Sequence, residues 1–338
     1  MQSAIQLSKY SHDSFIDFLK AYCIICVILA HNLPDLNAVA FCVWGGMQVP
    51  IFLLIQVFHA LKNGKKNLDV RKLFRRIILP FVIVEAFLFF FKIGVRIGHP
   101  EEISGFIKGF VKSGGCGPGS YYFWIYLQFA ITLPLIAPLF KNMKKSTLLL
   151  LFLTLSLGGE VFCSLVHMPE FVYRLLAVRY IFLIFLGYLW AKDGIIVNAF
   201  SLILSIISLA AILFFAYTDY NLEPFFFHTG WKCHRWLCYF YVANLLVFFL
   251  YQLYRLAKRQ DKFMSIISRI GKASWEIFLV QLCVFSIIPK HILSFIGNYW
   301  IENCIWIIFT LLCSIFLGHY LNLFLAYIRS GNVAKNNR

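Results

Sequence analysis

The chain has 338 residues, of which 61% are hydrophobic and 14% are charged, and its mean hydropathy is +0.77. Soluble chains are nearer half apolar and a quarter charged, so this composition excludes an ordinary soluble protein. The net charge of +16 would also fit a nucleic-acid-binding protein, but the basic residues lie in clusters between apolar runs, as they do around membrane helices. We therefore expect an all-α, polytopic membrane protein with no nucleic-acid partner.

Ten apolar runs, each near the twenty residues that cross a bilayer core, follow a short polar N-terminus. The expected spans are residues 14–33, 40–61, 76–97, 120–140, 146–166, 172–191, 196–217, 233–255, 273–290 and 299–327. No small-residue cleavage pattern follows the first run, so we interpret it as a retained helix and not as a signal peptide. The sequence has no evident repeat or soluble segment, which indicates one transmembrane domain over residues 1–338.

The basic clusters give this arrangement a direction. They follow the second, fourth, eighth and tenth expected spans, and the opposite loops are much poorer in Lys and Arg. The positive-inside rule then places both termini in the cytoplasm, with the protein in the cell membrane, most simply a bacterial inner membrane. In this topology Lys20 lies towards the cytoplasm and His31 lies towards the outer half of the membrane.

Lys20 and His31 are the two ionisable residues that stand out in the first span. They are eleven residues apart, which is about three helical turns and roughly 16 Å along one face. Because such groups are costly in a bilayer core, they usually face a cavity or a partner. Lys20 also fits a snorkelling residue paired with Asp17, and His31 fits an imidazole bonded to a neighbouring helix. A proton-transfer role for His31 is the functional alternative.

A basic run, residues 71–76, comes directly before the third expected span. Its ordinary role is to anchor the helix on the cytoplasmic side. The sharper interpretation is an anion site in which Lys72, Arg75 and Arg76 bind the phosphates of a donor, since guanidinium groups match phosphate oxygens.

Several other polar residues lie in apolar surroundings. Glu85 and Glu160 are candidates to orient His31 or an acceptor, because histidine bases often have a carboxylate partner, but each also fits an ordinary cavity-facing or helix-terminal carboxylate. Arg179 fits an acidic acceptor or a structural pair with Glu160 or Glu170.

Two further patterns carry little chemistry. His228, Cys233 and His234 match no common zinc spacing, so we expect no metal site. A disulfide among the cysteines nearest to loops stays open from the sequence; these are Cys116, Cys233, Cys238 and Cys304.

In combination, these patterns resemble the acyltransferase 3 family of integral membrane acyltransferases. The matching segments are Asp17-Phe18-Leu19-Lys20 followed by His31, residues 49–54, the basic residues 72–76 before Pro80, residues 120–127, residues 182–188 and residues 270–280. The chain departs from the family pattern at Gln56, Lys72 and Gln281, which indicates a divergent subgroup.

The resemblance implies a membrane O-acyltransferase. Such enzymes transfer an acyl group, commonly acetyl, from acyl-CoA as co-substrate to a hydroxyl of a carbohydrate or other surface molecule, and no bound cofactor is implied. The resulting assignments are His31 as the catalytic residue, Lys20, Lys72, Arg75 and Arg76 as donor-binding residues, and Asp17, Glu85, Glu160 and Arg179 as supporting residues. The alternative is a transporter or flippase for a glycan or another small polar molecule, since intramembrane ionisable residues also line translocation paths.

Overall fold

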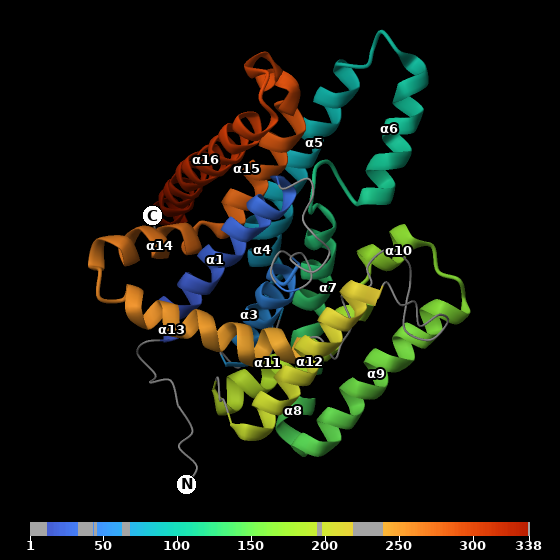
Figure 1. Cartoon of the computed structure of the whole chain (residues 1–338), viewed down its shortest axis with the longest axis vertical. Helices are drawn as coiled ribbons and strands as arrows, with labels where there is room; N and C mark the ends of the chain where they lie inside the picture. Colours follow the sequence, from blue (N-terminus) through green and yellow to red (C-terminus); the bar gives the residue numbers. More distant parts are fainter. Residues whose placement is uncertain are drawn as a thin grey trace.

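A computed structural model describes residues 12–32, 43, 46–62, 68–194, 198–218 and 239–336, and every regular element in these ranges is a helix (Figure 1). The all-α prediction is therefore confirmed. The elements are α1 (His12–Asn32), α3 (Gln48–Lys62), α4 (Val70–Leu73), η2 (Phe74–Ile78), α5 (Leu79–Gly94), α6 (Pro100–Ser113), α7 (Tyr121–Ile136), α8 (Leu139–Asn142), α9 (Lys145–Leu165), α10 (Glu170–Leu175), η3 (Val178–Tyr180), α11 (Phe182–Asp193), α12 (Ala199–Thr218), η5 (Tyr241–Leu246), α13 (Val247–Ala257), α14 (Asp261–Lys272), α15 (Ser274–Ile287), η6 (Lys290–Ile296) and α16 (Tyr299–Asn336).

Among the described residues, fewer than ten helices meet a membrane-span criterion of length and composition. Among the described residues, four helical segments are long and apolar enough to cross a membrane: Ser14–Asn32, Val70–Gly94, Lys145–Leu165 and Tyr299–Ile328. Helices α14 and α15 give a fifth if they are taken as one span bent by 70°. Four more apolar helices are shorter: Gln48–Lys62, Tyr121–Ile136, Ala199–Phe214 and Tyr241–Ala257. These helices fit a membrane protein, but the predicted count of ten is not confirmed.

The sixth expected span is interrupted between α10 and η3. Gln128 of α7 stabilises the interruption, because its Nε2 donates to the carbonyl oxygen of Leu175 at 2.6 Å and its Oε1 accepts from the amide of Ala177 at 3.0 Å. In an apolar environment, backbone groups left without partners are costly, so a broken helix needs such a side chain. An apolar run in the sequence does not reveal that contact.

Two helices, α6 and α14, lie where the sequence predicts only connections between spans. Helix α6 has the expected boundary signals, with Pro100 in its first turn, acidic residues beside it, Lys112 in its last turn and Gly114 in a left-handed conformation after its end. Each helix alone is too short to satisfy a span criterion, although α14 meets it together with α15 as a bent pair.

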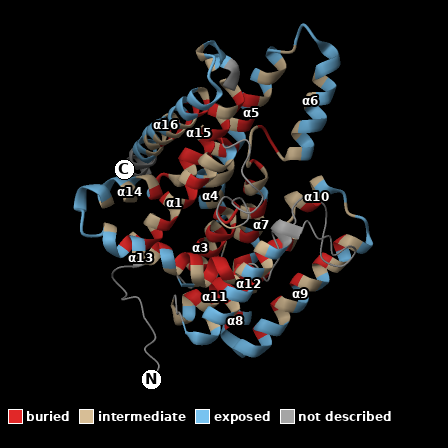
Figure 2. Cartoon of the chain, in the orientation of Figure 1, coloured by how far each residue is buried: buried red, intermediate tan, exposed pale blue. Residues whose placement is uncertain are grey.

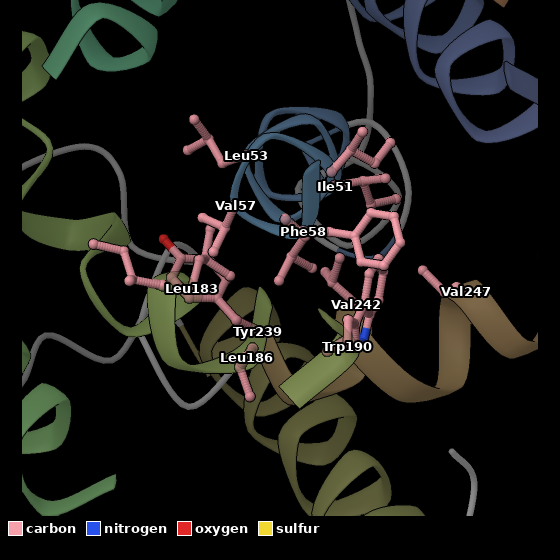
Figure 3. Close-up of a cluster of buried hydrophobic side chains, with 14 of the residues drawn as sticks. Ile51, Leu53, Val57, Phe58, Leu183, Leu186, Trp190, Tyr239, Val242 and Val247 are labelled. Atoms are coloured by element: carbon pink, nitrogen blue, oxygen red, sulfur yellow. The ribbon is translucent and has the colours of Figure 1, made fainter. Parts of the chain in front are cut away.

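Helices α3 and α11 pack closely against each other in the core (Figure 3). Val57 of α3 lies on the side of Leu183 of α11, and both belong to one buried apolar cluster with Leu53, Phe58 and Leu186. Buried residues gather at the centre of the helix bundle, whereas the outward faces of its helices are exposed (Figure 2). The exposed faces include many large apolar side chains, as a lipid-facing surface requires.

We expect Gly187→Ala to destabilise the protein, because a Cβ at Gly187 would lie 2.5 Å from the Cβ of Val57 across the α3–α11 contact. Overpacking of this kind costs about 1–3 kcal/mol, which thermal unfolding in detergent will measure. Gly158→Ala in α9 is the matched control, since a Cβ at Gly158 meets no atom within 4 Å. Equal unfolding midpoints for the two variants would contradict the close α3–α11 packing.

Candidate active site

A cavity of about 570 Å³ lies between α1, α3, the α4–η2 segment, α7 and the start of α15. We call it the central cavity. Four residues predicted from the sequence line it, namely Lys20, His31, Lys72 and Arg76. The structure thus brings together the first-span pair and two members of the basic run.

One face of α1 forms a wall of this cavity. Lys20, Ile24, Val27 and His31 line it with spacings of four, three and four residues, which is the repeat of a single helical face. The rest of α1 packs against other helices, so that Leu19, for example, is fully buried. The packing leaves the face with the two ionisable residues accessible, as their solvation requires.

The central cavity has two chemically different ends, and α15 gives their direction. Just before α15 begins, Lys272, the last residue of α14, lies near Asp17 at the beginning of α1, with 3.9 Å between Nζ and Oδ2. Three turns later Phe285 meets the ring of His31 edge-on, with 6.3 Å between ring centroids. Helices α1 and α15 therefore run side by side in the same direction, with lysines at one end and His31 at the other.

The basic end consists of Lys20, Lys72, Arg76 and Lys272, which all line the cavity. Asp17 orients two of them, because its carboxylate lies 3.9 Å from Nζ of Lys20 and 3.9 Å from Nζ of Lys272. Ser268 Oγ also donates to Asp17 Oδ2 at 3.1 Å, which fixes α14 against α1.

Sequence reasoning missed Lys272 as a member of this group. The residue belongs to the family-like segment 270–280, but no spacing along the chain relates it to Lys20. The two meet only because α14 packs on α1, where a Cβ on Gly271 would collide with the backbone carbonyl of Asp17. The sequence signal for this contact is therefore Gly271, because a glycine allows the two backbones to approach closely.

The histidine end is formed by His31 and Gly119. The His31 side chain is exposed and lines the cavity, and a Cβ at Gly119 would lie 3.6 Å from its Nε2 atom. Gly119 has φ +89°, a left-handed conformation that favours glycine. The glycine-rich run 114–119 lies between two expected spans, and its place beside His31 could not be inferred from the sequence.

Aromatic side chains line the middle of the cavity. Phe52, Tyr122, Tyr126, Trp275 and Phe278 come from three helices, α3, α7 and α15. Their neighbouring ring centroids lie between 5.5 and 6.1 Å apart along the series Phe52–Tyr122–Phe278–Trp275–Tyr126. Rings at these distances pack favourably and form a firm apolar wall between the basic end and His31.

Two predicted residues, Arg75 and Glu85, lie outside the lining of the central cavity. Arg75 is exposed on η2 and is not a lining residue of the central cavity. Glu85 is buried in α5, and its Oε2 accepts from the backbone amide of Cys116 at 2.6 Å. Burial, with the nearby Glu85 carboxylate, also raises the pKa of the Cys116 thiol to about 12, so this free thiol is neutral near pH 7.

Glu160 and Arg179 belong to a second buried polar cluster. Tyr173 OH donates to Oε1 of Glu160 at 2.8 Å and to Oε2 at 2.7 Å. The guanidinium of Arg179 lies over the rings of Tyr173 and Tyr180, 5.4 and 5.2 Å from their centroids. Neither Glu160 nor Arg179 lines the central cavity, so this cluster does not itself form part of the cavity wall.

The metal and disulfide candidates lie mainly outside the described residues. Within the part of the chain that the structure describes, no three His, Cys, Asp or Glu residues are placed to hold a metal ion. His228, Cys233, His234 and Cys238 lie outside the described residues. Cys116 and Cys304 are free thiols.

The segment that matches a known protein family contains the whole central cavity. A family model described as an acyltransferase domain matches residues 13–319, which include α1 and every lining residue of the central cavity. The chain belongs to the acyltransferase 3 family. Membership in the acyltransferase 3 family indicates a membrane acyltransferase. Comparisons with curated proteins and with solved structures found no match.

We expect Tyr173→Phe to lower stability while leaving the central cavity intact. It removes the hydrogen bond to the buried Glu160 carboxylate, which should cost about 1.5–3 kcal/mol for a bond to a charged group. Thermal unfolding in detergent checks the loss, and Tyr320→Phe on the exposed face of α16 is the matched control. Unchanged stability of Tyr173→Phe would show that this bond contributes little.

Proposed function

We propose that the protein is a membrane O-acyltransferase that moves an acyl group, acetyl by default, from cytoplasmic acyl-CoA to a hydroxyl of a cell-surface or exported carbohydrate. One observation carries the proposal: the same cavity is lined by a group of cations at one end and by an accessible imidazole at the other. Membership in the acyltransferase 3 family supports the reaction class. The identities of the donor, the acceptor and the acyl group are proposed in addition to this reaction class.

The basic end suits the donor. Coenzyme A carries several phosphate charges, and Lys20, Lys72, Arg76 and Lys272 offer ammonium and guanidinium donors to them. The distance from Lys20 to His31 along α1 is about 16 Å, and the extended pantetheine arm of CoA spans a comparable length. With its phosphates at the basic end, the arm passes the aromatic wall and brings the thioester to His31.

The histidine end suits the transfer step. The Nε2 atom of His31 takes the proton of the acceptor hydroxyl as its oxygen attacks the thioester carbonyl carbon. A C–O bond forms, the C–S bond breaks, and the CoA thiolate takes a proton from the imidazolium. In a relay variant of this scheme, the imidazole first takes the acyl group itself and then passes it to the hydroxyl.

We expect His31→Ala to abolish acyl transfer in a protein that still folds and inserts, because it removes the imidazole that takes the proton of the acceptor hydroxyl. Membranes incubated with labelled acetyl-CoA and surface glycans provide the assay, with label in a base-labile ester as the product. His319→Ala in α16 is the control, since His319 does not line the cavity. Normal turnover by His31→Ala would remove the catalytic role, and acceptor translocation without acylation would favour the transporter alternative.

We expect Arg76→Gln and Lys272→Gln to raise KM for acyl-CoA with little change in kcat, because each removes a cation that binds the donor in ground and transition state alike. Losing one charge-assisted bond should raise KM about 10-fold or more. Arg255→Gln is the control, an exposed arginine in the last turn of α13 that does not line the cavity. A smaller effect at Arg75, which is exposed on η2, would agree with its position.

Unchanged KM in both variants would contradict donor binding at the basic end. It would leave the acyl-transfer reaction itself in place, because His31 is tested separately.

A further inference from the structure

The connection between α6 and α7 is unusually constrained. We call residues 114–119 the glycine loop. Gly114, Gly115, Gly117 and Gly119 all have positive φ angles, of 73°, 144°, 81° and 89°. Other residues rarely adopt such angles, so the loop follows a path that only glycine allows without strain. Helix α6 is largely exposed, whereas Gly115 and Cys116 in the loop are buried (Figure 2).

A buried carboxylate holds this path in place. The Cys116 amide donates to Oε2 of Glu85 at 2.6 Å, and Glu85 is only 6% exposed. A Cβ on Gly115 would lie 2.6 Å from Oε1 of the same carboxylate, so the glycine is what allows the loop to approach Glu85. A hydrogen bond to a buried acceptor oxygen is shielded from competition with water.

Further contacts hold the two ends of the loop. Trp124 Nε1 donates to the carbonyl oxygen of Gly114 at 2.6 Å. Gln281 Nε2 lies 3.5 Å from the carbonyl oxygen of Pro118, and a Cβ on Gly117 would lie 3.0 Å from Oγ of Ser286. Gln281 departs from the family pattern, and here it contacts the loop from α15.

The loop ends at the reacting group. Gly119 is its last residue and lies against both His31 and Phe278, with 3.6 Å from a built Cβ to Nε2 and 3.5 Å to the ring of Phe278. Because Cys116 and Gly119 are three residues apart in one constrained loop, a shift of the Glu85 contact also shifts the backbone beside Nε2.

We propose that Glu85 is a positioning residue, which by accepting the Cys116 amide holds the glycine loop so that Gly119 bounds the space at Nε2 of His31. The proposal rests on the proposed function of His31 for its kinetic consequence. Glu85 acts through the loop and does not touch the substrates. It differs from the roles predicted from the sequence, in which Glu85 orients His31 or an acceptor.

The main test replaces Glu85 by Leu and by Gln in the full-length protein in detergent. Glu85→Leu removes the acceptor, so kcat should fall by about 100-fold, as misplacement near 1 Å can cause, with KM for acyl-CoA unchanged. Glu85→Gln keeps an acceptor oxygen and should recover most of kcat. A change in KM without a fall in kcat would overturn the positioning role. Equal kcat values for Glu85→Leu and Glu85→Gln would also overturn it.

Two readouts do not depend on acyl transfer. Amide hydrogen exchange over residues 114–119 should accelerate in Glu85→Leu, and carbethoxylation of His31, mapped by mass spectrometry, should become faster as the loop leaves Nε2. Unchanged exchange and unchanged modification would overturn the proposal even where transfer is observed. If the wild-type protein transfers no acyl group, the proposed function fails, and these two readouts still decide the position of the loop.

A second pair of variants reaches the same contact from the loop. Gly115→Ala places a methyl group against the Glu85 carboxylate and should reproduce the kcat loss and the faster exchange. Gly109→Ala is the matched control, because a Cβ there in α6 meets no atom within 4 Å. This pair keeps the proposal testable if Glu85→Leu does not fold, and wild-type kcat with wild-type exchange in Gly115→Ala would overturn it.

Discussion

The constraint on which this structure depends is the cost of placing two ionisable side chains on one membrane helix. Lys20 and His31 occupy the same face of α1, and neither is compatible with direct contact to lipid tails at that depth. The neighbouring helices resolve the conflict by packing against the other faces of α1 and leaving this one beside a cavity. The two ends of the cavity therefore differ chemically, because α1 carries the cation Lys20 near the start of the helix and the imidazole of His31 near the end of the helix.

Much of the fold and part of the site could be predicted from the sequence. Apolar runs located the principal helices, because burial in lipid or protein favours such runs in either case. The helical repeat placed Lys20 and His31 on one face, and the basic run contributed Lys72 and Arg76 to the same cavity. Both predictions depend on geometry within one helix or on local charge, which a sequence records directly.

The remaining features depend on contacts between distant segments. The number of spans could not be settled because hydropathy does not distinguish a crossing helix from a short buried one, and because Gln128 supports a break within an apolar run. Lys272 joins the basic end only through the packing of α14 on α1. Glu85 contacts Cys116, thirty-one residues away, so its actual partner was hidden from any local pattern.

The 70° bend between α14 and α15 has a mechanical consequence. Lys272 lies on one side of the bend, Ser274 and Trp275 lie on the other, and all three line the cavity. This part of the cavity wall therefore crosses a joint between two helices that point in different directions. Asp17 of α1, which contacts Ser268 and Lys272 of α14, holds the α14 side of that joint against α1.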